Sequence, residues 1–141
     1  LWLDILEAFA QNNCNIMPVL DGENNYIGYY QLIDIISLFN GTPFFSEPGG
    51  IIVIEKGQND FSFSEISQIV ESNNAKLLGA FISKNKNDLT QITLKIGKSG
   101  LSTILQEFRR YGYTIISGHE DDIFLQTLKE RSAYLDTYLN L

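Results

Sequence analysis

Asp34 is the residue whose type and position first suggest chemistry. It lies in the stretch MPVLDGENNYIGYYQLIDI, residues 17–35, where two short apolar runs flank a turn rich in Gly and Asn and a helical pattern then begins. A carboxylate there could anchor a polar ligand. It could equally be an ordinary first-turn acid, which the helix dipole favours by roughly 0.3 to 1 kcal/mol without a ligand. The residues alone leave both interpretations open.

Three other groups of residues could be taken for reactive sites, and their spacing counts against each. GKSG at 97–100 lacks the earlier glycine of a phosphate-binding loop, because Ile92 stands in its place, and Ser99 is predicted to cap a helix. His119 is followed by three consecutive acids, which cannot surround one metal ion. Cys14 would need His119, about a hundred residues away, as its base. We therefore expect neither an enzyme nor a metal site.

The elements around Asp34 are predicted from apolar periodicity. Apolar residues at spacings of three and four indicate helices, and short β-rich runs on either side of a Gly/Asn turn indicate a hairpin. These patterns predict a helix, a hairpin and a second helix, over residues 3–12, 15–21 with 26–30, and 32–40.

A boundary between two domains is predicted near residue 48. The stretch TPFFSEPGG, residues 42–50, combines two of the three prolines with a Gly-Gly pair. Its Phe44-Phe45 pair is unusual for a free linker, so we expect it to be packed. Residues 1–47 and 48–141 are therefore interpreted as separate domains of an α+β protein.

The second domain has a different pattern of elements. Residues 50–57 read as a strand and 62–74 as a helix with Ser62 and Glu65 in capping-box spacing. Two strands follow, separated by the polar loop KNKND, and in the second of them Ile92, Leu94 and Ile96 alternate with Thr93 and Lys95, which should face water. A helix and a last strand complete a β-α-β-β-α-β order. Two right-handed crossovers would then place both helices on one face of a four-stranded antiparallel sheet, a ferredoxin-like arrangement.

The C-terminal tail is predicted to form one more helix. Phe124, Leu128, Leu135 and Tyr138 lie near heptad spacing with charged residues between them. Such a helix is expected to dock on the domain or on a second chain.

Composition limits the classes of partner. The chain has 141 residues, 44% of them hydrophobic, and a single cysteine, which indicates a globular protein of a reducing compartment, and we expect it in the cytoplasm. A net charge of −7 would repel nucleic acid and anionic lipid. No apolar run approaches the roughly 20 residues that cross a bilayer. We therefore expect no nucleic-acid and no membrane partner.

Residues 3–40 resemble one CBS motif, the repeat of cystathionine-β-synthase type. The resemblance rests on PVLD, the turn, the strand with Gly28, and LIDII. It implies a regulatory module in which two motifs form a cleft for an adenine nucleotide (AMP, ADP or ATP). Asp34 would accept hydrogen bonds from the ribose hydroxyls, Gln31 stands where the motif has Ser or Thr, and Met17 and Pro18 would complete the nucleotide site. The strand that precedes the motif and its companion motif are expected outside these residues.

Residues 51–117 resemble an ACT domain, an amino-acid-sensing module that often pairs side by side between subunits. The two resemblances together are similar to small bacterial CBS proteins of the acetoin-utilisation type. They imply a regulatory, ligand-sensing homodimer with no required cofactor. The alternative is an oligomerisation or protein-interaction module without a functional ligand site. Gln31, which lacks a short hydroxyl, and a first loop without Pro-Gly before the helix favour that alternative.

Overall fold

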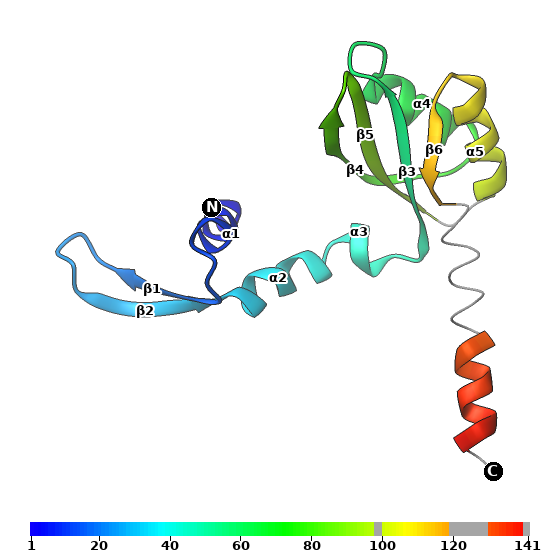
Figure 1. Ribbon diagram of the computed structural model, residues 1–141. Helices are drawn as coiled ribbons and strands as arrows, with labels where there is room; N and C mark the ends of the chain where they lie inside the picture. The colour runs from blue at the N-terminus through cyan, green and yellow to red at the C-terminus, as the bar shows by residue number, and fades with distance from the viewer. Residues whose placement is uncertain (98–99, 119–129, 140–141) are drawn as a thin grey trace. The chain divides into compact units, whose positions relative to one another are not determined.

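The chain is a mixed α+β protein of two compact units. A computed structural model describes residues 1–97, 100–118 and 130–139. The units are Leu1–Glu47 and Pro48–Leu141, and each contains one antiparallel sheet (Figure 1). We refer to them as unit 1 and unit 2.

Unit 1 has the predicted helix, hairpin and helix, followed by a short helix that was not predicted. The short helix begins at Pro43, directly after Thr42, and proline is well suited to a first helical position because its φ is already helical and its missing N–H needs no partner. The elements are α1 (Trp2–Asn12), β1 (Ile16–Leu20), β2 (Tyr26–Gln31), α2 (Leu32–Asn40) and α3 (Pro43–Ser46).

The buried core of unit 1 is small. Phe9 of α1 and Ile35 of α2 are its buried hydrophobic residues among those described. Trp2 packs edge to face on Phe39, with ring centroids 4.7 Å apart, and this contact joins the two helices. Phe45 contacts Phe39 in turn, with centroids 6.2 Å apart, so one member of the aromatic pair expected to be packed is in contact with α2 although it stays exposed.

Unit 2 has the predicted β-α-β-β-α-β order. Its four strands form an antiparallel sheet in the order β4-β5-β3-β6, so the first and third strands of the unit are central (Figure 1). The elements are β3 (Gly49–Gly57), α4 (Phe63–Ser72), β4 (Leu77–Lys86), β5 (Leu89–Gly97), α5 (Leu101–Arg110) and β6 (Thr114–Ser117).

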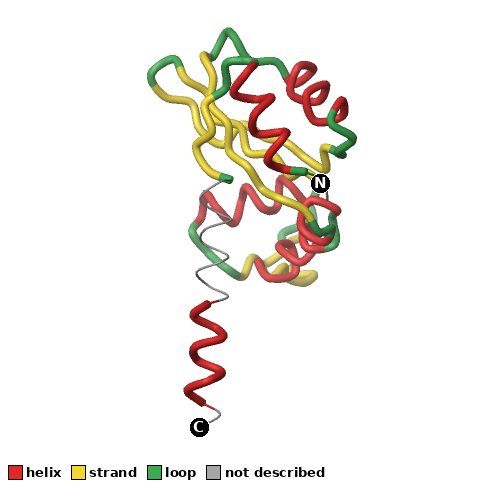
Figure 2. Tube along the Cα trace, turned by 90° about the vertical axis from the view of Figure 1, so that its right-hand side faces the viewer, coloured by secondary structure: helices red, strands yellow, loops and turns green. Residues whose placement is uncertain are grey.

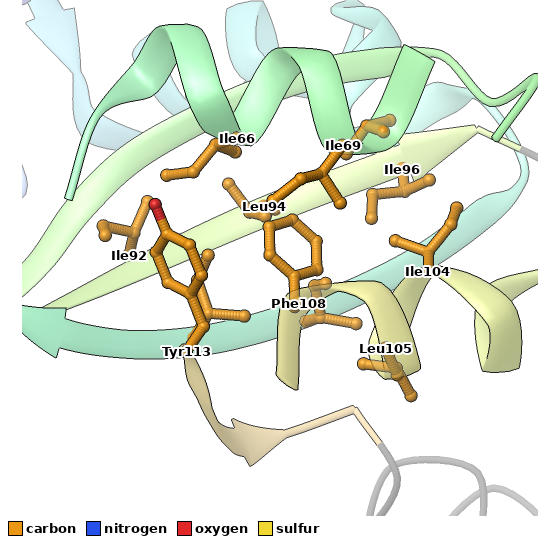
Figure 3. Close-up of a cluster of buried hydrophobic side chains, with 12 residues drawn as sticks. Ile66, Ile69, Ile92, Leu94, Ile96, Ile104, Leu105, Phe108 and Tyr113 are labelled. Atoms are coloured by element: carbon orange, nitrogen blue, oxygen red, sulfur yellow. The ribbon is translucent and has the colours of Figure 1, made fainter. Parts of the chain in front are cut away.

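The core of unit 2 lies between the sheet and one layer made of α4 and α5. Figure 2 shows both helices on the same side of the strands. In Figure 3 side chains from α4, α5 and β5 converge on this interior, and the predicted stripe on β5 is buried there. The labelled core residues are Ile66, Ile69, Ile92, Leu94, Ile96, Ile104, Leu105, Phe108 and Tyr113.

Two details of the β4–β5 hairpin were predicted wrongly. The strands run to Lys86 and from Leu89, so only Asn87 and Asp88 form the turn, both with positive φ, rather than a five-residue loop. Such left-handed pairs match the twist of a two-residue hairpin turn. Lys95, expected to face water, is only 7% exposed. It lies on a central strand, where neighbouring side chains can cover the aliphatic stem of a lysine.

The capping box predicted at α4 is only half formed. Ser62 Oγ accepts a hydrogen bond from the Glu65 backbone N–H at 3.4 Å. The Glu65 carboxylate is instead held by other elements, because Tyr113 Oη donates to it at 2.9 Å and Lys56 Nζ at 3.2 Å. Lys56 also donates to the Tyr111 carbonyl at 2.9 Å. This network joins the ends of β3, α4 and the α5–β6 connection.

We expect this network to make the stability of unit 2 depend on pH. The hydrogen bonds from Tyr113 and then Lys56 lower the pKa of Glu65 below its ordinary 4.5. A lowered carboxyl pKa means that this stabilisation is present above about pH 4.5 and is lost as the pH falls below it. Glu65→Gln should therefore be less stable than the wild type at pH 7, and the difference should shrink toward pH 3.

Urea unfolding across this pH range measures the difference. Glu71→Gln on the same helix is the control, because the Glu71 carboxylate is exposed to solvent. A Glu65→Gln deficit that stays constant from pH 7 to 3 would contradict the role of the ionised carboxylate.

The predicted C-terminal helix falls partly outside the described residues. Residues 130–139 are helical, and Leu135 and Tyr138 are exposed on them together with Tyr134 and Leu139. Phe124 and Leu128 lie outside the described residues.

Candidate functional site

The candidate site is the junction between the hairpin and α2, where Asp34 stands. Gln31 ends β2 and is the N-cap residue of α2, with extended backbone and no hydrogen bond from its side chain to the helix. The Leu32 backbone N–H donates to the Asn15 carbonyl at 2.9 Å, which ties the start of the helix to the strand before it. Asp34 is the third helical residue of α2.

The Asp34 side chain is available to a ligand. It is exposed, and it makes no hydrogen bond or ion pair to any residue that the structure describes. A carboxylate at this helix position is favoured by the dipole, so its presence alone does not require a ligand. The geometry is therefore compatible with both interpretations of Asp34, as a carboxylate that binds a ligand and as a first-turn acid favoured by the helix dipole.

The strand register separates the four predicted site residues. Gln31 pairs with Ile16, and Pro18 pairs with Tyr29, so these four residues lie on one face of the hairpin. Met17 pairs with Tyr30 and lies on the opposite face, because successive strand residues alternate. Pro18 and Gln31 are thus brought to a common face, and Met17 is not.

The face that carries Pro18 is apolar and exposed. Its residues Ile16, Pro18, Leu20 and Tyr29, which we call the hairpin face, are all exposed to solvent. Exposed apolar residues continue elsewhere in unit 1, where twelve large hydrophobic side chains are exposed and only Phe9 and Ile35 are buried. Exposed apolar side chains that share one strand face are typical of an interaction site.

Unit 2 contains a groove that the sequence did not predict. A shallow groove of about 140 Å³ lies beside the β4–β5 turn, and Gln91 Nε2 donates to Glu55 Oε2 inside it at 2.9 Å. Its charged groups come from strands distant in sequence, so no local spacing indicates it. The lining residues are Glu55, Lys84, Lys86, Asn87, Leu89 and Gln91.

Neither a metal-binding cluster nor a membrane-spanning helix is found among the described residues. Among them, no three His, Cys, Asp or Glu side chains are grouped so as to hold a metal ion. In the same part of the chain, every helix is too short or too polar to cross a membrane.

Comparison with known proteins identifies no family. No family model matches the chain, and none of the curated proteins matches it.

Proposed function

We propose that the protein is a cytoplasmic regulatory module in which unit 1 is one half of a CBS-type cleft for an adenine nucleotide. The cleft is complete only when a companion module covers unit 1, and Asp34 accepts hydrogen bonds from the ribose hydroxyls of the nucleotide. Unit 2 is an ACT-like domain that holds two chains together as a homodimer. Ligand binding acts by favouring one packing of the paired units over another, which requires different affinities for the two packings.

The exposed apolar surface of unit 1 is the main support for this proposal. A unit of 47 residues that buries two large hydrophobic side chains among those described has a small core, and units of this size are marginally stable on their own. The resemblance to a CBS motif explains this, because such motifs function in pairs. The uncovered surface includes the hairpin face, directly before the helix that carries Asp34.

The topology of unit 2 supports the ACT-like part of the proposal. Its strand order β4-β5-β3-β6, with both helices on one face, is that of a ferredoxin-like sandwich. Strand β4 is ten residues long and lies at the edge of the four-stranded sheet, and an edge strand is a common site of pairing with a second chain.

Asp34→Ala should abolish the effect of adenine nucleotides on thermal stability. A ligand that binds only the folded state increases the free energy of unfolding, by about 2.7 kcal/mol at a ligand concentration of 100 Kd. The melting temperature rises as a result. AMP, ADP and ATP are tested separately on the wild type, on Asp34→Ala and on Asp4→Ala. Asp4 is the matched control because it is an exposed acid at the third helical position of α1.

The two interpretations of Asp34 predict different results. If Asp34 is only a dipole-favoured acid, both variants respond to nucleotides in the same way as the wild type. If it holds the ribose, only Asp34→Ala loses the response. No response of the wild type to any of the three nucleotides would refute the proposed ligand.

A second candidate function is an interaction module without a ligand site. The specific observations in its favour are that Met17 lies on the face opposite Pro18 and that Gln31 makes no capping bond. It predicts a dimer whose stability is the same with and without nucleotides.

A further inference from the structure

The charges of the chain are divided unequally between its two units. Residues 1–47 contain six acids and no lysine, arginine or histidine, so all ten basic residues of the chain lie in residues 48–141. Unit 1 is therefore a purely acidic unit with an exposed apolar surface. The acids are Asp4, Glu7, Asp21, Glu23, Asp34 and Glu47.

Three of these acids bracket the hairpin face. Asp21 and Glu23 lie in the turn at one end of the hairpin, and Asp34 lies in the first turn of α2 at the other end. Hydrogen bonds from the backbone N–H groups of Asn25 and Glu23 lower the pKa of Asp21, which keeps its charge in place. The strand between the two ends has five residues, which span roughly 16 Å at the usual rise of a strand.

We propose that the hairpin face binds a basic surface of a partner. The part of the partner that contacts it is an apolar segment with a lysine or arginine at each end. The apolar centre would cover Pro18 and Tyr29, and the flanking cations would lie against Asp34 at one end and Glu23 at the other. This deepens the proposed function, on which it rests for assigning a companion to unit 1. The companion also brings the positive groups that nucleotide phosphates require and that unit 1 lacks.

Charge separates this partner from a second copy of unit 1. Two copies pressed together through the hairpin face would juxtapose the same acids without a single cation from either unit. Like charges placed opposite each other at an interface are costly and exclude wrong partners, whereas opposite charges speed encounter and fix the register. The charges of unit 1 therefore favour a basic occupant over a second copy of unit 1.

Two labelled peptides test the proposal by fluorescence anisotropy on the 141-residue chain, with no nucleotide present. KKLAFLAKK has the expected charges, and EELAFLAEE has the same apolar centre with opposite ends. We expect the first to bind at least tenfold more tightly. Its affinity should fall about tenfold between 50 and 500 mM salt, because exposed charge pairs are screened.

Matched variants locate the site. Tyr29→Ala should weaken binding of the basic peptide several-fold, whereas Tyr30→Ala, next in sequence but on the opposite face, should not. Glu23→Gln combined with Asp34→Asn should weaken it about tenfold. Asp4→Asn combined with Glu7→Gln, which removes as many charges from α1, should leave it unchanged.

Three results would overturn the proposal. The first is equal affinity for the two peptides, or no binding of either. The second is an equal effect of Tyr29→Ala and Tyr30→Ala on binding of the basic peptide. The third is self-association that becomes tighter in Glu23→Gln/Asp34→Asn, which would mean that a second copy of the chain covers the hairpin face. Peptide binding in a protein that ignores nucleotides would leave this proposal standing and refute only the nucleotide.

Discussion

Replacing Phe108 with alanine is expected to lower the free energy of unfolding of unit 2 by about 3–5 kcal/mol. Phe108 is fully buried in the middle of the core, between the sheet and α4 (Figure 3). Its ring packs edge to face on Tyr113, with centroids 5.4 Å apart. The substitution therefore leaves a cavity and also removes the ring that positions the Tyr113 hydroxyl on Glu65.

Phe63→Ala is the control for this prediction. Phe63 is the first residue of α4, is 42% exposed, and contacts Phe61 at its edge. Its loss should cost under about 1 kcal/mol. Urea unfolding followed by far-UV circular dichroism measures both variants, while the single tryptophan, Trp2, reports unit 1 separately. Equal losses for the two variants would contradict the assignment of Phe108 to the core.

Gly49→Ala is expected to destabilise unit 2 by about 1–3 kcal/mol or more. Gly49 begins β3 opposite Gly97 of β5, and a Cβ added to it would overlap the Ile96 carbonyl oxygen. Because that atom belongs to the backbone of a central strand, it cannot move aside as a flexible side chain would. The pair must separate, and the first ladder hydrogen bonds of the two central strands are lost.

Gly41→Ala provides the matched control. Gly41 follows α2 with φ −80°, and the nearest atom to an added Cβ is the Leu38 carbonyl oxygen at 3.7 Å. The Cβ of an alanine at this position contacts no atom too closely, and alanine lowers the conformational entropy of the unfolded chain. The free energy of unfolding should therefore be unchanged or raised by up to about 1 kcal/mol. The same unfolding experiment compares the two variants, and a Gly49→Ala protein as stable as Gly41→Ala would refute the close approach of β3 to β5.

The fold of unit 2 was predictable because its periodicity is strong. Ile92, Leu94 and Ile96 alternate along β5, and their burial follows from that alternation. Tyr113 was missed as a core residue because its burial depends on Phe108 and Glu65, which approach it only in the folded chain. The short helix at Pro43 was missed although Thr42-Pro43 is a helix-start signal, because the prolines and glycines around it were interpreted as a boundary.

The candidate site was predictable only in part. The position of Asp34 in the first turn of α2 follows from the sequence, and so does the opposition of Met17 and Pro18, since neighbouring strand residues alternate. The exposure of the hairpin face could not be predicted. An amphipathic strand pattern predicts which side chains share a face, but it does not predict whether another element packs against that face.

Native mass spectrometry of the intact protein, with and without added AMP, ADP or ATP, tests dimerisation and nucleotide binding together, because it reports the number of chains and any bound ligand. We expect a dimer that gains the mass of one of these nucleotides, with the added mass absent in Asp34→Ala and retained in Asp4→Ala. A protein that gains no nucleotide at saturating concentration, or an Asp34→Ala variant that gains the same mass as the wild type, would contradict this expectation.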